Sequence, residues 1–191
     1  MIISHSGREY PPSWYDAAYL AQDTKPRQPA HAMRQAEMLW LPALRQCVGS
    51  VLDIGCGPGY VGELAYAMGL DYAGVDSSAV AIKIACRGSD GAYDCAHWSD
   101  IDDDIWAAAD TVLLLEVLEH LQSDVMLLDR IPANKRVVYS VPNFYTPGHL
   151  RHYEHPIDAV QAYQSRIAHD QYEICTSNGK NMWWLHVGTK R

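Results

Sequence analysis

The sequence predicts an α/β fold, with a doubly wound, mostly parallel sheet of seven strands that ends in a C-terminal antiparallel hairpin. Short apolar runs alternate with segments whose apolar residues recur at helical spacing. A glycine-rich turn, Gly55–Gly59, joins the first of these runs to a helical segment. Asn178-Gly179, between the last two runs, is typical of a tight hairpin turn. Such alternation predicts parallel strands with helices on both faces.

The composition is that of one globular domain of 191 residues, 48% hydrophobic and 20% charged. No apolar run reaches the roughly 18 residues of a membrane span, and residues 1–8 lack the pattern of a signal peptide. The five cysteines form no CxxC pair, so we expect neither a zinc site nor a disulfide framework, and a cytoplasmic protein without a membrane partner. The net charge of −8 weighs against a long polyanionic partner.

Residues 1–28 are expected to form an irregular arm or lid, because they are rich in proline and aromatic residues. One or two helical turns are predicted around Trp14–Leu20. Residues 29–191 are predicted to form a single domain. It starts with a helix over residues 29–46, where Pro29 suits the first turn and apolar residues mark one face.

The other elements follow in alternation. Strands are expected where apolar and β-branched residues run together, at Val51–Ile54, Tyr72–Val75, Thr111–Leu115 and Arg136–Val141, with a weak strand near Tyr93–Trp98. Helices are expected where the apolar spacing is three to four, at Val61–Met68, Ala79–Ala85, Leu118–Arg130 and, behind Pro156, Ile157–His169. The hairpin arms are predicted at Tyr172–Thr176 and Met182–Gly188.

The turn after Val51–Ile54 predicts a nucleotide-like cofactor, because glycines let a backbone approach a ligand closely and the following helix presents free N–H groups. Two spacings compete. Gly57 to Gly62 satisfies GxGxxG, the dinucleotide pattern. However, that pattern closes the strand with its first glycine, and here Gly55 closes it, with Pro58 at the centre of the turn. Counted from Asp53, the spacing is acidic-x-Gly-x-Gly-x-Gly.

This second spacing resembles the first motif of the class I S-adenosylmethionine-dependent methyltransferases. Other segments resemble further parts of that family: Gly74-Val75-Asp76 the end of its second strand, Ser99-Asp100 the segment after its third, Asp110–Glu116 its fourth strand, Val138–Asn143 its fifth, and the C-terminal hairpin its sixth and seventh. The resemblance implies the Rossmann-like methyltransferase fold and S-adenosylmethionine as cofactor. A plain tight strand-to-helix connection is the alternative for the glycine turn alone.

The resemblance also implies cofactor contacts, residue by residue. Gly55, Cys56, Gly57 and Gly59 would surround the methionine portion, and Asp53 would hold its ammonium group or brace the loop. Asp76, with Ser77 beside it, would accept the ribose hydroxyls. Asp100 would contact the adenine, and Glu116 would border the pocket.

Glu116-Val117-Leu118-Glu119-His120 is the second informative segment, because positions i, i+3 and i+4 share one side of the expected helix. It resembles the ExxEH motif of ubiquinone-biosynthesis O-methyltransferases and of small-RNA 3′-terminal 2′-O-methyltransferases, where the motif is associated with a divalent metal. Arg151–His155 resembles a further segment of the RNA group. The implied ligands for Mg²⁺ or Mn²⁺ are Glu116, Glu119, His120 and His155, with His152 as second choice for the last. Without a metal, His120 would act as general base or brace a loop.

The function expected is O-methylation of a small-molecule acceptor, with or without a metal, and His120, Glu116 and Glu119 as candidate catalytic residues. An RNA 3′ end is the alternative acceptor within the family. An NAD(P)-dependent oxidoreductase and a non-catalytic cofactor-binding scaffold are the alternatives outside it. The acidic run of Asp100, Asp102, Asp103 and Asp104 is interpreted as a solvated loop. The acceptor atom and the oligomeric state stay open.

Overall fold

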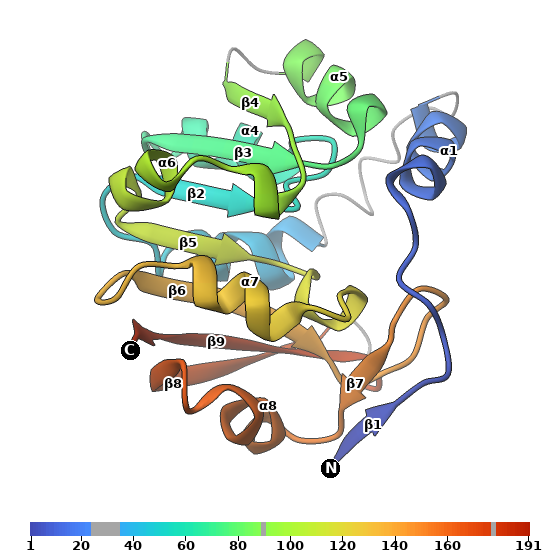
Figure 1. Ribbon diagram of the computed structural model, residues 1–191, viewed down its shortest axis with the longest axis vertical. Coiled ribbons are helices and arrows are strands. Elements are labelled where there is room, and N and C mark those ends of the chain that lie inside the picture. Colours follow the sequence, from blue (N-terminus) through green and yellow to red (C-terminus); the bar gives the residue numbers. More distant parts are fainter. Residues whose placement is uncertain (24–34, 89–90, 177–178) are drawn as a thin grey trace.

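The computed structural model describes residues 1–23, 35–88, 91–176 and 179–191, and it has the predicted seven-stranded sheet. The strand order is β4-β3-β2-β5-β6-β9-β8, with five parallel strands and an antiparallel hairpin at one edge (Figure 1). The strands are β2 (Val51–Ile54), β3 (Tyr72–Asp76), β4 (Ala92–Cys95), β5 (Thr111–Leu114), β6 (Arg136–Pro142), β8 (Ile167–Thr176) and β9 (Met182–Lys190). Strand order reverses between β2 and β5, which is where ligands bind in such sheets.

Helices cover both faces of the sheet and give each face its own apolar cluster, since successive side chains of a strand point to opposite sides. On β5, Val112 and Leu114 belong to the first cluster and Leu113 to the second. The first cluster includes residues of α6 (Asp103–Ala108), α7 (Asp124–Arg130) and α8 (Pro156–Tyr163). The second includes residues of a π-helix, η1 (Ala36–Trp40), and of α3 (Leu41–Leu44) and α4 (Tyr60–Ala67). None of the helices among the described residues is long and apolar enough to cross a membrane.

The helix predicted over Leu118–Arg130 is divided in the structure. A 3₁₀ turn, η3 (Leu118–His120), is separated from α7, which begins at Asp124. Glu116 adopts a left-handed conformation with φ of 58°, so no helix extends from β5 into this turn. The expectation that Glu116, Glu119 and His120 share one helical face is therefore wrong.

Three other predicted boundaries shift. The helix expected over Ile157–His169 ends at Tyr163, and residues 167–169 pair with β9 as the start of β8. The weak third strand ends at Cys95, and Trp98 opens a 3₁₀ turn, η2 (Trp98–Asp100). Part of the acidic run expected to be a loop forms α6, because Trp106 is buried there. The first part of the helix expected over residues 29–46, and Asn178 of the hairpin turn, lie outside the described residues.

The N-terminal arm is more regular than predicted. It begins with β1 (Ile2–Ser4), which pairs antiparallel with β7 (Arg151–Tyr153), and it continues into α1 (Pro12–Asp23), which lies against α5 (Ala79–Gly88) (Figure 1). Asp16 on α1 accepts hydrogen bonds from the Ser78 hydroxyl (2.6 Å) and the Val80 backbone N–H (3.1 Å) at the start of α5. The arm thus crosses the carboxyl ends of the strands and is fixed on both sides.

A histidine in the hairpin makes stability depend on pH. His186 on β9 is fully buried and stacks on Tyr139, with ring centroids 4.9 Å apart. Neither of its ring nitrogens has a hydrogen-bond partner in the part of the chain that the structure describes. Burial, with a smaller contribution from His169, lowers the pKa of His186 to about 3. The folded protein therefore keeps this ring neutral.

We expect His186→Phe to protect the fold against acid. Below pH 6.5, His186 becomes protonated in the unfolded chain but stays neutral in the folded chain. His186 therefore lowers the free energy of unfolding progressively as the pH falls toward about 3. Between pH 8 and pH 5 this amounts to about 2 kcal/mol. Urea unfolding of both proteins at the two pH values should show a smaller loss in the variant. An equal loss in both would contradict a neutral, buried His186.

Candidate active site

The glycine turn between β2 and α4 requires glycine for both conformation and space. Gly55, Gly57 and Gly59 have φ values of 75°, 54° and 80°, which residues with a Cβ rarely adopt. A Cβ on Gly55 would lie 2.7 Å from a methyl carbon of Val117, and one on Gly57 would lie 3.0 Å from the Tyr19 hydroxyl. The turn therefore packs closely against the segment after β5 and against the arm.

Asp76, the last residue of β3, holds this turn in place. Its Oδ2 accepts a hydrogen bond from the Gly57 backbone N–H (2.9 Å), and its Oδ1 accepts one from the Ser78 backbone N–H (2.8 Å). Burial raises the pKa of Asp76, although both hydrogen bonds oppose the shift. Each carboxylate oxygen retains a second lone pair that can accept from a ligand.

Asp53 and Cys56 lie behind the turn. Asp53 is buried and accepts a hydrogen bond of 2.5 Å from the Tyr72 hydroxyl. Burial raises the pKa of Asp53 to about 7. Cys56 is also buried, and its sulfur would lie 2.9 Å from a Cβ placed on Gly74. Neither residue is among those that line the cavity described below, and the two roles expected for Asp53 stay predictions.

A cavity of about 480 Å³ opens at the carboxyl ends of the strands, beneath the arm. Its size is typical of a small-molecule site. The strand ends contribute Ile54, Gly55, Val75, Asp76, Ser77, Ala96, His97, Trp98, Glu116, Val117, His120 and Leu121. The arm contributes Glu9, Tyr10, Pro11, Pro12, Tyr15 and Tyr19.

The cavity includes five of the residues singled out in the sequence: Gly55, Asp76, Ser77, Glu116 and His120. It does not include Asp100, which is exposed. The turn η2 points Trp98 inward and leaves Asp100 in solvent, where it accepts from the Ser99 hydroxyl. The adenine contact expected of Asp100 therefore has no support from the cavity wall and stays a prediction. His97 and Trp98 were missed. The aromatic richness of residues 1–28 indicated a lid, and Tyr15 and Tyr19 of that segment line the cavity.

Glu116 faces the cavity from the left-handed position after β5. The Ser140 hydroxyl donates a hydrogen bond to its Oε1 (3.1 Å) and accepts one from its backbone N–H (3.0 Å). Burial raises the pKa of Glu116 to about 7. An adjacent cation would favour the ionised form of this carboxyl group.

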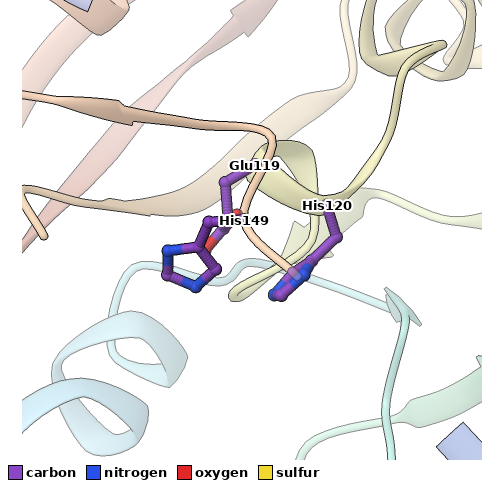
Figure 2. A group of neighbouring side chains, drawn as sticks. All are labelled: Glu119, His120 and His149. Carbon is purple, nitrogen blue, oxygen red and sulfur yellow. The ribbon is translucent and has the colours of Figure 1, made fainter. Parts of the chain in front are cut away.

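Glu119, His120 and His149 form a cluster beside the cavity (Figure 2). One ligand atom of each lies within 4.8 Å of the others. The predicted metal set is corrected in two places. Glu116 turns to Ser140 and is not in the cluster, and His155 instead caps the start of α8. His149 takes the place expected of His155 or His152; nothing in the sequence distinguishes it from its neighbours in that loop.

The two histidines are held in a defined tautomer. His120 Nδ1 lies 3.0 Å from the Gly148 carbonyl oxygen, and His149 Nδ1 lies 3.1 Å from that of Phe144. Since a carbonyl oxygen only accepts, each Nδ1 carries the hydrogen and each Nε2 keeps a free lone pair. Burial lowers the pKa of His120 to about 4, so its ring is neutral at neutral pH.

Glu119 is fully buried, and neither of its carboxyl oxygens has a hydrogen-bond partner among the described residues. Burial, and then the nearby charge of Glu116, raise the pKa of Glu119 far above its usual range. The backbone around it is firmly held. The Arg151 guanidinium donates to the carbonyl oxygens of Leu118 (3.2 Å) and Leu121 (2.9 Å), and the Leu150 N–H donates to that of Glu119 (2.8 Å).

Comparison with known proteins identifies the family. A model of the methyltransferase domain matches residues 19–176. The chain belongs to this methyltransferase family. The dinucleotide interpretation of the glycine turn is thereby disfavoured, and the class I S-adenosylmethionine-dependent resemblance is confirmed at the level of family and fold.

Individual relatives of this methyltransferase domain are distant. It is 30% identical over 100 residues to the mitochondrial ubiquinone biosynthesis O-methyltransferase of Schizosaccharomyces pombe, a match of 47% of this chain but only 36% of that enzyme. The fold resembles that of the N-methyltransferase NodS of Bradyrhizobium japonicum, solved with S-adenosylhomocysteine (TM-score 0.67, 16% identity, 92% and 98% of the two chains). It also resembles that of a 1,6-didemethyltoxoflavin-N1-methyltransferase of Burkholderia thailandensis (TM-score 0.65, 19% identity, 99% and 94%).

The glycine turn can be tested against a matched position. Gly55→Ala and Gly69→Ala both place alanine at a left-handed position, with φ of 75° and 74°. A Cβ added at Gly55 would meet Val117, whereas a Cβ added at Gly69 would have no atom within 4 Å. We expect Gly69→Ala to lower the free energy of unfolding by about 1 kcal/mol and Gly55→Ala by roughly 2–4 kcal/mol, with loss of cofactor binding. Urea unfolding and calorimetry measure both. Equal effects of the two substitutions would contradict the close packing at Gly55.

Proposed function

We propose that this protein transfers the methyl group of S-adenosylmethionine to a hydroxyl oxygen of a small-molecule acceptor. The observation that carries the proposal is the cavity in which the glycine turn, Asp76 and Glu116 face His120 beneath the arm. The family match supplies the class of cofactor. The O-methyltransferase among the relatives supports oxygen as the acceptor atom.

In this proposal, different residues of the cavity contact different parts of the cofactor. Gly55 and the turn behind it adjoin the methionine portion, and Asp76 accepts the ribose hydroxyls through its free lone pairs. His97 and Trp98, which line the cavity where Asp100 does not, are the residues proposed to contact the adenine. Glu116 offers a carboxylate to the sulfonium. The pKa of Glu116 is raised because its carboxyl group is desolvated in a site without a neighbouring cation, and a bound sulfonium would favour the ionised form.

In the reaction, the acceptor oxygen attacks the methyl carbon, the methyl–sulfur bond breaks and S-adenosylhomocysteine leaves. The acceptor proton passes to the free Nε2 of His120. A weak base suffices, because the hydroxyl becomes strongly acidic as its oxygen is alkylated. The arm aligns the methyl donor with the acceptor and excludes water from the site.

A small acceptor is favoured over an RNA 3′ end. The net charge of −8 opposes a polyanion, and the described cavity wall offers carboxylates rather than the cations that phosphates require. One structural relative, the 1,6-didemethyltoxoflavin-N1-methyltransferase, was solved with 1,6-didemethyltoxoflavin bound.

The cofactor assignment is tested by calorimetry with S-adenosylhomocysteine. We expect the wild-type protein to bind it and Asp76→Ala to weaken binding about tenfold or more, since both the turn and the ribose lose a carboxylate. Asp71→Ala is the matched control, because that carboxylate is exposed, precedes β3 at the end opposite Asp76 and lies outside the cavity. No binding by the wild type, or equal effects of the two substitutions, would contradict the assignment. Binding of a nicotinamide dinucleotide instead would favour the oxidoreductase, and cofactor binding without methyl transfer to any acceptor would favour the scaffold.

The cluster of Glu119, His120 and His149 also fits a divalent metal ion. Two neutral imidazoles with free Nε2 lone pairs and a buried carboxyl group without a partner are the groups such an ion requires. This donor set suits Mn²⁺ or Zn²⁺ better than Mg²⁺, which prefers oxygen ligands. When bound, the ion would lower the pKa of an acceptor hydroxyl. It would occupy the lone pair of His120, so metal binding and a general-base role for His120 exclude each other.

Metal binding is tested with His149→Ala and, as matched control, His155→Ala. If an ion binds, we expect the affinity for Mn²⁺ or Zn²⁺ to fall about 10–100-fold in His149→Ala and to be unchanged in His155→Ala. Elemental analysis and metal titration of the purified proteins measure this directly. Equal metal content in both variants, together with full activity in excess EDTA, would leave His120 as the general base.

A further inference from the structure

The arm covers one end of the cavity with aromatic rings. Tyr10 stacks on Trp14, with ring centroids 4.3 Å apart and planes at 19°, and Tyr15 meets His120 edge to face at 6.3 Å. Tyr10, Tyr15 and His120 all line the cavity. Flat walls of this kind favour a flat, ring-shaped acceptor next to His120.

The same end of the cavity carries a carboxylate to which the proposed function assigns no contact with the cofactor. Glu9 lines the cavity, and its Oε2 accepts a hydrogen bond of 2.9 Å from the Gln122 backbone N–H. That bond ties the carboxylate to the segment that directly follows His120 and Leu121, which line the same cavity. Asp76 and Glu116 are the other carboxyl groups of the described wall, which contains no lysine or arginine.

The charge of Glu9 acts on groups within the cavity. Burial raises the pKa of the Tyr15 hydroxyl to about 12, and Glu9 is the largest contributor among the neighbouring charges. A negative charge that disfavours a tyrosinate also disfavours an anionic ligand at the same place. The net charge of −8 acts in the same direction at longer range.

We propose that Glu9 makes the acceptor end of this cavity selective for uncharged or cationic ring-shaped acceptors and excludes anionic ones. The proposal rests on the proposed methyl transfer and specifies its substrate class. The methyltransferase-domain match begins at residue 19, so Glu9, Tyr10 and Tyr15 lie outside the residues that the family model matches. Residues of this kind are suited to set the specificity of an individual family member.

The test uses protein loaded with S-adenosylhomocysteine and three matched ring probes: 4-methylcatechol, 4-(2-aminoethyl)catechol and 3,4-dihydroxybenzoate, which are neutral, cationic and anionic. We expect the anionic probe to bind about tenfold or more weakly than the other two in calorimetry. Glu9→Gln keeps an oxygen for the Gln122 N–H but removes the charge. It should strengthen binding of the anionic probe about tenfold, weaken the cationic one and leave the neutral one unchanged.

Glu173→Gln is the matched control, because it removes the same charge from an exposed position on the edge strand β8. It should leave all three affinities unchanged. The proposal is overturned if the anionic probe binds as tightly as the neutral one, if Glu9→Gln leaves the order of affinities unaltered, or if no probe binds to the loaded protein. Failure to bind S-adenosylhomocysteine at all would instead overturn the proposed function.

Discussion

The hydrogen bonds of the Asp76 carboxylate are the interaction on which the rest of the site depends. One oxygen holds the glycine turn through the Gly57 N–H, and the other holds the start of α5 through the Ser78 N–H. The Ser78 hydroxyl in turn donates to Asp16 on the arm. A single chain of contacts thus joins the glycine turn, the end of β3 and the arm that covers the cavity.

Much of the fold could be predicted from the sequence, because the sheet depends on local patterns. Alternating apolar runs located the strands, and the glycine spacing located the cofactor turn. The failures have long-range causes. In the sequence, the apolar spacing continues from β5 into α7 without a break. In the structure, the left-handed backbone at Glu116 turns the chain, and α7 begins only at Asp124. The pairing of β1 with β7 places His152 in a strand, and His155 caps α8, whereas His149 of the loop before β7 lies beside Glu119 and His120. No local pattern in the sequence records these long-range contacts.

Electrostatics connects the site to its proposed chemistry. Carboxyl groups that lose hydration without gaining a cation are destabilised in their ionised form. Asp76 and Glu116 both have raised pKa values in a cavity whose described wall contains no lysine or arginine. A cationic ligand would relieve that cost. S-adenosylmethionine carries a sulfonium, whereas its product S-adenosylhomocysteine does not. The site is therefore expected to hold the substrate cofactor more strongly than the spent one when Glu116 is ionised.

The ratio of the affinities for S-adenosylmethionine and S-adenosylhomocysteine at pH 6 and pH 8 tests this account most directly. The two ligands share their other charged groups, so the ratio isolates the sulfonium. Because the pKa of Glu116 is about 7, the preference for S-adenosylmethionine should rise several-fold from pH 6 to pH 8, and Glu116→Gln should abolish the rise. A ratio that is the same at both pH values in the wild-type protein would contradict a cavity built around a cationic methyl donor.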